Sequence, residues 1–186
     1  RIFYLSARTT AQANAEGCLQ RIRAAGGLLR SVTITAKAKI CFRGLEICEP
    51  AGCPFADGYY GRLPDALDEV HNDGGAAYTR EVIEALAKKH SLCPYELSLD
   101  IALISDVIIC DYNYVFDPTV FLRRFFLEGS PGDIVLLIDE AHNLVDRPIQ
   151  LFSAIIRKKL LLQAMRGIDA SGNPAGRGAA EAVSRH

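Results

Sequence analysis

The fold is decided by one stretch of sequence, Ile134-Val-Leu-Leu-Ile138-Asp139-Glu140-Ala-His142. Its first five residues are apolar without alternation, which is typical of a strand buried on both faces of a sheet. Three other runs share this character, at residues 2–5, 29–35 and 107–110. Helical patterns separate the runs, and strand–helix alternation predicts an α/β fold with right-handed crossovers and a parallel sheet.

Two helices are marked by their ends. Thr9-Thr10-Ala11-Gln12 offers a capping box, and apolar residues then follow at helical spacing as far as Gly26. Asp117-Pro118 supplies an N-cap and a first-turn proline, which predicts a helix over residues 119–127. About seventy residues separate the second and third strand runs, more than one crossover helix needs, so we expect a small inserted subdomain there.

The acidic pair after the 134–138 strand indicates nucleotide hydrolysis. Ligands of open α/β sheets lie at the carboxyl ends of strands, so a buried strand would deliver Asp139 to the Mg²⁺ of a bound nucleotide. Glu140 would orient and deprotonate the attacking water, and His142 would relay the nucleotide state to neighbouring elements. The alternative is an exposed acidic turn at the end of a strand.

Four cysteines form a candidate metal site with the spacing Cys41-x6-Cys48-x4-Cys53-x39-Cys93. Proline follows Cys53 and Cys93, which predicts that each lies at a helix N-terminus, where the helix dipole favours the ligating thiolate. Zinc ribbons pair their ligands in short knuckles, so the spacing favours an iron–sulfur cluster but leaves zinc open. We expect the two remaining cysteines, Cys18 and Cys110, to pack as small apolar residues.

Composition limits what the rest of the chain can bind and where the protein can lie. The 186 residues are 49% hydrophobic with a formal net charge of −1, so contacts with nucleic acid must come from local basic patches. No apolar run is long enough to span a membrane, and we expect a cytoplasmic protein. The chain begins at Arg1, its single methionine is Met165, and residues 167–186 are rich in Gly and Ala. We therefore interpret the sequence as a fragment, ending in a linker.

Several motifs in order resemble the XPD/DinG-type iron–sulfur DEAH helicases of superfamily 2, and the closest likeness is to bacterial members. Residues 4–10 (YLSARTT) look like that family's motif Ia, and residues 35–42 (TAKAKICF) like the lead-in to its first cluster cysteine. Residues 53–60 (CPFADGYY), 93–96 (CPYE) and 111–118 (DYNYVFDP) are similar to its later segments. Asp139-Glu-Ala-His-Asn is similar to motif II, so the resemblance covers most of the chain.

The resemblance implies a RecA-like parallel sheet with helices on both faces, interrupted by a small helical iron–sulfur insertion. Motor domain 1 would comprise residues 1–36 and 97–147, the insertion residues 37–96, and an arch-like insertion or linker residues 148–186. It also implies a [4Fe–4S] cluster on Cys41, Cys48, Cys53 and Cys93, and ATP-driven 5′→3′ translocation on single-stranded or forked DNA. We expect a monomer. No GxxxxGK[ST] phosphate loop occurs among the 186 residues, so this chain alone is not expected to hydrolyse ATP. The alternative is a non-catalytic nucleic-acid-binding or zinc-binding module.

Candidate DNA contacts fall in two places. Arg8 and Thr9 follow the first strand, where a helix N-terminus and a cation suit a phosphate. Basic residues interleaved with aromatics bracket the cysteines and suit a single strand: Lys37, Lys39, Arg43 and Arg62, with Tyr59 and Tyr60. Alternatively, Arg8 is merely solvated, Thr9 only caps, and the two tyrosines pack the core of the insertion. We expect Tyr112 and Tyr114 to be structural, since they follow a buried strand.

Overall fold

The computed structural model describes residues 1–44, 48, 52–120, 122–126 and 133–144. Residues Arg1–Leu144 form one compact unit, and Val145–His186 form a second that lies outside the described residues. The predicted linker or arch-like segment at 148–186 therefore also lies outside them.

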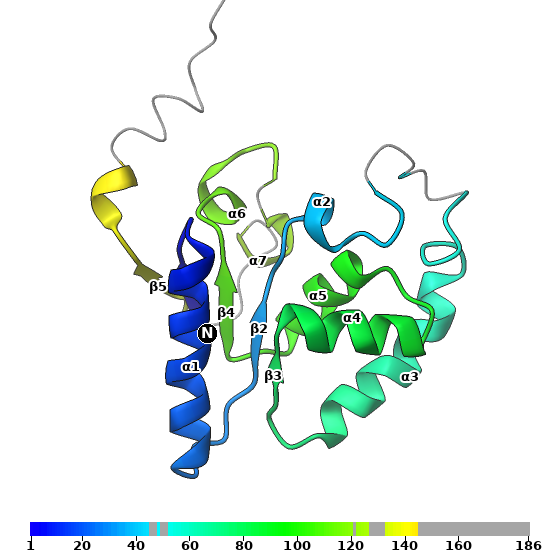
Figure 1. Ribbon diagram of the computed structural model, residues 1–186, viewed down its shortest axis with the longest axis horizontal. Coiled ribbons are helices and arrows are strands. Elements are labelled where there is room, and N and C mark those ends of the chain that lie inside the picture. The colour runs from blue at the N-terminus through cyan, green and yellow to red at the C-terminus, as the bar shows by residue number, and fades with distance from the viewer. Residues whose placement is uncertain (45–47, 49–51, 121, 127–132, 145–186) are drawn as a thin grey trace, which may run out of the picture. The chain divides into compact units, whose positions relative to one another are not determined.

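A parallel sheet of five strands organises the first unit, in the order β3-β2-β4-β1-β5 (Figure 1). All four strand pairings are parallel. The strands are β1 (Ile2–Leu5), β2 (Ser31–Thr33), β3 (Ala77–Tyr78), β4 (Val107–Cys110) and β5 (Val135–Ile138). Four of them coincide with the predicted apolar runs, although β2 is shorter than expected. The expected burial of β5 on both faces is wrong, because β5 is an edge strand of the described sheet and its Val135, Leu136 and Leu137 are exposed. The predicted α/β parallel sheet is confirmed.

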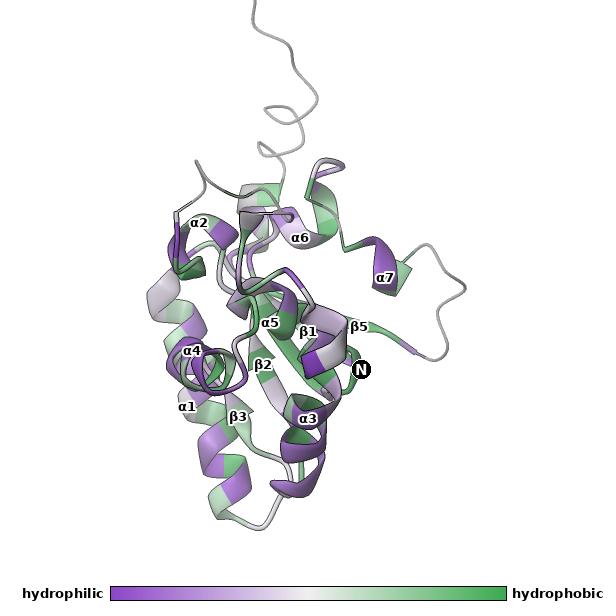
Figure 2. Ribbon diagram, turned by 90° about the vertical axis from the view of Figure 1, so that its right-hand side faces the viewer, coloured by the Kyte–Doolittle hydropathy of each residue, from purple (hydrophilic) through white to green (hydrophobic). Residues whose placement is uncertain are grey.

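Helices cover both faces of this sheet (Figure 2). On one face Phe3 is fully buried and meets Phe125 of α7 (Arg123–Phe126) edge to face, with 5.4 Å between ring centroids. On the other face α1 (Thr9–Ala24) lies along Ile2 and Tyr4 of β1, with which its residues share an apolar hollow. The alternation of side chains along β1 thus divides them between the two helical layers.

The N-terminal end of α1 differs from the prediction. Its N-cap residue is Arg8, and no side chain caps it, so the expected capping box is wrong. The amide of Gln12 instead donates to the carbonyl of Ser6 at 2.9 Å, which fixes the turn between β1 and α1. The helix buries none of its residues fully, and Cys18 is exposed, contrary to the expected packing position. Cys110 is buried at the end of β4, as predicted.

The segment after β4 also departs from expectation. The short helix α6 (Asn113–Phe116) comes first, and the predicted helix over 119–127 is reduced to α7, with residue 127 outside the described part. Asp117 accepts hydrogen bonds from the backbone N–H and the hydroxyl of Thr119, at 2.8 and 2.6 Å. These bonds close a tight local turn, which competes with helix formation. Leu122 and Phe125 are nevertheless buried against the sheet.

Among the described residues, four α-helices and one strand lie in the long interval between β2 and β4. They are α2 (Lys37–Ile40), α3 (Tyr59–Asn72), β3, α4 (Arg80–Lys89) and α5 (Pro94–Leu103). The strand β3 pairs with β2, with Ser31 opposite Ala77, so this interval contributes an edge to the main sheet. Sequence patterns did not predict β3. The insertion limits at residues 37 and 96 remain a prediction. No helix among the described residues is long and apolar enough to cross a membrane.

Candidate functional site

The carboxyl end of β5 places Asp139 beside the end of β1. The Asp139 N–H donates to the carbonyl of Leu5 at 3.0 Å, which extends the strand pairing by one residue. The hydroxyl of Ser6 lies 3.1 Å from Oδ2 of Asp139, and the phenol of Tyr112 donates to the Asp139 backbone carbonyl. Both the backbone and the carboxylate of Asp139 are therefore held from neighbouring strand ends. A carboxylate held in this way is suited to binding Mg²⁺.

Glu140 follows in an uncommon conformation. Its φ of 50° lies in the left-handed region, which costs free energy for a residue other than glycine and which often occurs at functional sites. The turn directs the side chain outward, where Oε1 lies 3.7 Å from Nη1 of Arg8 and Oε2 lies 3.4 Å from Nδ1 of His142. His142 belongs to a single 3₁₀ turn, η3 (Ala141–Leu144). The three predicted catalytic residues and Arg8 thus lie together.

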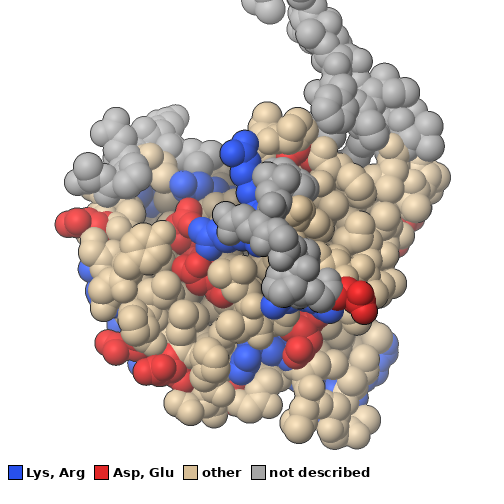
Figure 3. Space-filling model, turned by 180° about the vertical axis from the view of Figure 1, so that it is seen from behind, with Lys and Arg blue, Asp and Glu red and all other residues tan. Residues whose placement is uncertain are grey.

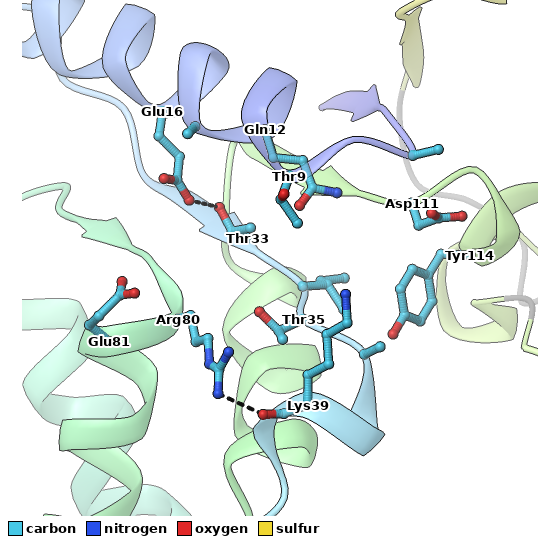
Figure 4. A pocket seen from close by; sticks show the side chains of 14 residues that line it. Thr9, Gln12, Glu16, Thr33, Thr35, Lys39, Arg80, Glu81, Asp111 and Tyr114 are labelled. Atoms are coloured by element: carbon cyan, nitrogen blue, oxygen red, sulfur yellow. Dashed lines mark hydrogen bonds between the residues drawn. The ribbon is translucent and has the colours of Figure 1, made fainter.

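A polar hollow of about 230 Å³ opens at the carboxyl ends of β1, β2 and β4 (Figure 4). Thr9 lies on one wall, and the side chain of Lys39 extends into the hollow from the opposite wall. Arg80 donates to the Lys39 carbonyl at 2.7 Å, and the Thr33 hydroxyl donates to Glu16 at 2.5 Å. Two of the predicted DNA contacts, Thr9 and Lys39, are therefore brought together. Acidic groups line the hollow too: Glu16, Glu81 and Asp111.

The four predicted ligands line a second cavity, of about 290 Å³. Cys41 follows α2, and Cys93 is the N-cap of α5 with Pro94 in the first turn, as its sequence predicts. Cys53 differs, because it begins a single turn in which its carbonyl accepts from the N–H groups of Ala56 and Asp57 at 3.0 and 2.8 Å. The expected helix start at Cys53 is therefore wrong, and α3 begins only at Tyr59.

Burial and hydrogen bonding act in opposite directions on the pKa of the Cys93 thiol. Burial raises the pKa of the Cys93 thiol, and the N–H groups of Glu96 and Tyr95 counter this by stabilising its thiolate. A hydrogen bond with Cys48 raises the pKa of Lys37, whose ammonium also lies 5.7 Å from the centroid of the Tyr95 ring. Lys37 therefore faces the cysteines, so its predicted role in binding DNA is at odds with its position.

The other predicted DNA contacts near this cavity differ in whether their side chains are exposed to solvent. Tyr60 is 78% exposed, whereas Tyr59 is 6% exposed and donates to Oδ2 of Asp100 at 2.7 Å. The Tyr59 ring therefore has no face open to a base, and it packs the core instead. Nη1 of Arg43 donates to the carbonyl of Gly52 at 2.5 Å, which joins the segments around the first and third cysteines.

The donor set around this cavity fits a metal cluster. Four thiols from separate segments line it, together with two cations, Lys37 and Arg43. Among the described residues, no group of three or more His, Cys, Asp or Glu side chains is close enough to hold a single ion. A zinc ion draws sulfur ligands to about 2.3 Å from one point, whereas each thiolate of a [4Fe–4S] cluster binds a different iron. Four thiols around one cavity fit either group, so the choice between zinc and a cluster stays a prediction.

Sequence reasoning missed the residues that hold these sites in place. Ser6 and Tyr112 support Asp139, and nothing in their local sequence indicates this. Arg124 of α7 donates to Asp100 at 2.7 Å and to Glu96 at 3.2 Å, and so ties the segment before β5 to the cysteine-bearing α5. Acidic and basic side chains are intermixed on the face drawn in Figure 3, in keeping with the net charge of −1.

A family model named DEAD_2 matches residues 10–161, most of the chain. The chain belongs to the DEAD_2 family. The predicted likeness to XPD/DinG-type helicases is confirmed by this family match and by relatives. A solved structure of a truncated XPD superimposes with a TM-score of 0.52 at 19% identity, covering 89% of this chain and 47% of that one. This likeness supports the RecA-like fold.

Curated relatives of this DEAD_2 chain include proteins named as helicases. It is 32% identical over 63% of its length to the general transcription and DNA repair factor IIH helicase subunit XPD of Arabidopsis thaliana. It is 29% identical over 70% of its length to the Fanconi anemia group J protein homolog of Gallus gallus. The matches span 14% and 10% of these proteins, so the chain corresponds to a small part of each. A bacterial origin stays a prediction.

Proposed function

We propose that this DEAD_2 chain supplies the first motor domain of an ATP-dependent DNA helicase and carries a [4Fe–4S] cluster. The observation that carries the proposal is the placement of Asp139 and Glu140 at the carboxyl end of β5, beside the end of β1. Ligands of open parallel sheets bind at this edge. Family membership, and relatives named as helicases, support the same conclusion.

In the proposed hydrolysis, Asp139 would hold the Mg²⁺ of Mg-ATP, and the hydroxyl of Ser6 would orient the Asp139 carboxylate. Mg²⁺ neutralises charge on the phosphates when it is bound. Glu140, which is partly exposed, accepts a proton from the attacking water, and its oxygens lie near the cations of Arg8 and, when protonated, His142. Because the 186 residues contain no GxxxxGK[ST] phosphate loop, the chain alone would not hydrolyse ATP.

The four-cysteine cavity is the proposed cluster site. Cys41, Cys48, Cys53 and Cys93 would bind one iron each, and the cluster would cross-link α2, the turn before α3 and the start of α5. Lys37 would offset part of the negative charge of the four thiolates. The role of the cluster in this proposal is structural: it fixes the shape of a subdomain built from short helices.

The proposed DNA ligand is a single strand, at a fork or alone, along which the protein moves 5′→3′ as a monomer. Thr9 and the N–H groups at the start of α1 would contact a phosphate across the hollow from Lys39. Tyr60 would stack on a base, because its ring is exposed at the start of α3. The guanidinium of Arg8 lies 3.7 Å from Glu140, so a bound phosphate would compete with Glu140 for this cation.

The test is ATP hydrolysis, with and without single-stranded DNA, in a protein that combines this chain with a phosphate loop and a second motor domain. The Glu140→Gln variant should lose about a hundredfold or more in turnover while it still binds DNA. Glu69→Gln is the matched control, because Glu69 is an exposed carboxylate on α3 that pairs with Lys89 and His90. Equal rates in the two variants would reject Glu140 as the base.

A further inference from the structure

Arg62 of α3 binds the two turns that carry the third and fourth cysteines. Its Nη2 lies 3.1 Å from the carbonyl of Pro54 and 2.7 Å from that of Asp57, both in the turn that begins at Cys53. The same guanidinium reaches the carbonyl of Ser91, at 2.9 Å from Nη2 and 3.2 Å from Nε. Ser91 lies two residues before Cys93. One half-buried side chain thus spans both cysteine segments.

The surrounding backbone is shaped around this contact. Ser91, which follows the end of α4, has a φ of 54°, in the left-handed region. Gly58, the N-cap of α3, has a φ of 63°, and a Cβ built there would lie 3.0 Å from Nη1 of Arg62. Both residues therefore occupy strained or glycine-favouring positions next to the guanidinium.

We propose that Arg62 is the positioning residue that holds the Cys53 turn against the Cys93 turn and thereby shapes the four-thiol cavity. The inference rests on the proposed cluster role of that cavity. Arginine suits the task because its planar fork offers five N–H donors, whereas lysine offers a point charge. Its Nε and Nη2 donate to backbone carbonyls, so we assign Arg62 to the two turns beside this cavity and not to DNA.

The test compares Arg62→Met and Arg62→Lys with a matched control, Arg23→Met. Arg23 is also half-buried and also joins two loops, through the carbonyls of Leu29 and Gly75 at 3.0 and 3.1 Å, but it holds no cysteine segment. Arg23→Met should lower general stability similarly, as judged by urea unfolding. Gly58→Ala is a second, milder variant, since its Cβ would displace the guanidinium without removing it.

Two measurements distinguish a role of Arg62 in positioning the cysteines from a general effect on stability. The first is the electron paramagnetic resonance spectrum of the reduced cluster, together with the reduction potential of the cluster, in the full protein. These should change in Arg62→Met, change less in Arg62→Lys, and match wild type in Arg23→Met. The second needs no cluster. Amide hydrogen exchange over residues 53–58 and 90–94 should become about tenfold faster or more in Arg62→Met, and stay unchanged in Arg23→Met.

The outcomes are distinguishable. Unchanged exchange in both segments of Arg62→Met, with an unchanged cluster spectrum, would overturn the role of Arg62. A wild-type protein that contains no iron would reject the proposed cluster. In that case the exchange measurement still decides whether Arg62 holds the two turns together. If Arg62→Met does not fold, Arg62→Lys and Gly58→Ala provide the same comparison.

Discussion

The hydroxyl of Ser6 lies 3.1 Å from Oδ2 of Asp139, so side chains as well as backbone join the ends of β1 and β5. Ser6 is 1% exposed, and a buried hydrogen bond to a carboxylate is stronger than an exposed one. The Tyr112 phenol fixes the Asp139 carbonyl on the other side of the backbone. The carboxylate is therefore oriented by the fold itself, before any ion or nucleotide binds.

Replacing Ser6 by alanine should weaken this orientation without removing the carboxylate. In a protein with a complete ATP site we expect Ser6→Ala to lower kcat/KM for ATP hydrolysis about tenfold, with a raised requirement for Mg²⁺. Ser105→Ala is the control, since Ser105 is also buried but donates to the Ile101 carbonyl, at the far end of β4 from Asp139. If titration with Mg²⁺ gave the same curve for both variants, Ser6 would have no part in holding the ion.

Lys37 and Lys39 are two residues apart and are predicted to act at different sites. Lys37 faces the cysteines, so Lys37→Met should shorten the lifetime of the 400 nm cluster absorbance in air and leave affinity for single-stranded DNA nearly unchanged. Lys39 extends into the polar hollow, so Lys39→Met should weaken DNA binding and reduce its salt dependence by about one ion. The prediction of separate roles would be contradicted if Lys37→Met weakened DNA binding and Lys39→Met shortened the cluster lifetime, or if both variants showed both losses equally.

Tyr59 gives a prediction for alkaline pH. Burial raises the pKa of the Tyr59 phenol, and the hydrogen bond to Asp100 raises it further. Because the folded pKa lies above the unfolded value of about 10, the stabilisation is complete below pH 10. It is lost above that pH, at up to about 1.4 kcal/mol per pH unit, as the unfolded chain releases its proton.

Urea unfolding between pH 8 and pH 11 measures this effect. Tyr59→Phe should remove the contribution of this group to the pH slope and also lower stability at pH 8 by about 1–2 kcal/mol, through loss of the Asp100 bond. Tyr60→Phe is the control, because Tyr60 is 78% exposed. An identical pH slope in Tyr59→Phe and wild type would show that the phenol ionises equally in both states.

Tyr60 gives the corresponding prediction for DNA. Removing its exposed ring in Tyr60→Ala should weaken binding of a single strand by about 1–3 kcal/mol, with little preference for sequence, because every base has a face that can stack. Fluorescence anisotropy with a labelled oligonucleotide measures the affinity. The stability of the variant should be close to wild type. Binding unchanged by the substitution would leave Tyr60 without a role at the DNA.

The parts of the fold that sequence predicted are those with a strong local signal. The strands β1 and β4 appear as uninterrupted apolar runs, because a central parallel strand is covered on both faces. The strand β5 is equally apolar but lies at the edge of the described sheet, where Val135, Leu136 and Leu137 are exposed. The strand β3 was missed because it has two residues, Ala77 and Tyr78, which carry no periodicity. The predicted helix over 119–127 failed because the side chain of Asp117 closed a turn where an N-cap was expected.

The candidate site was also predicted only in part. Residue type and spacing were enough to select Asp139, Glu140 and the four cysteines as candidates, and to predict that Cys93 is an N-cap. The direction of a side chain does not follow from them. Lys37, the first residue of α2, lines the cavity with the thiols, while Arg62 donates to backbone carbonyls. These orientations depend on contacts between segments that are far apart in the sequence, which local patterns do not encode.

The most direct test of the central claim is the metal content of the protein after anaerobic purification. A protein that carries the proposed cluster should contain about four iron and four acid-labile sulfide per chain, with absorbance near 400 nm, and should lose both in Cys93→Ser. Cys18→Ser, which alters an exposed thiol outside the cavity, should retain them. One zinc per chain without iron, or full iron retention in Cys93→Ser, would contradict the account.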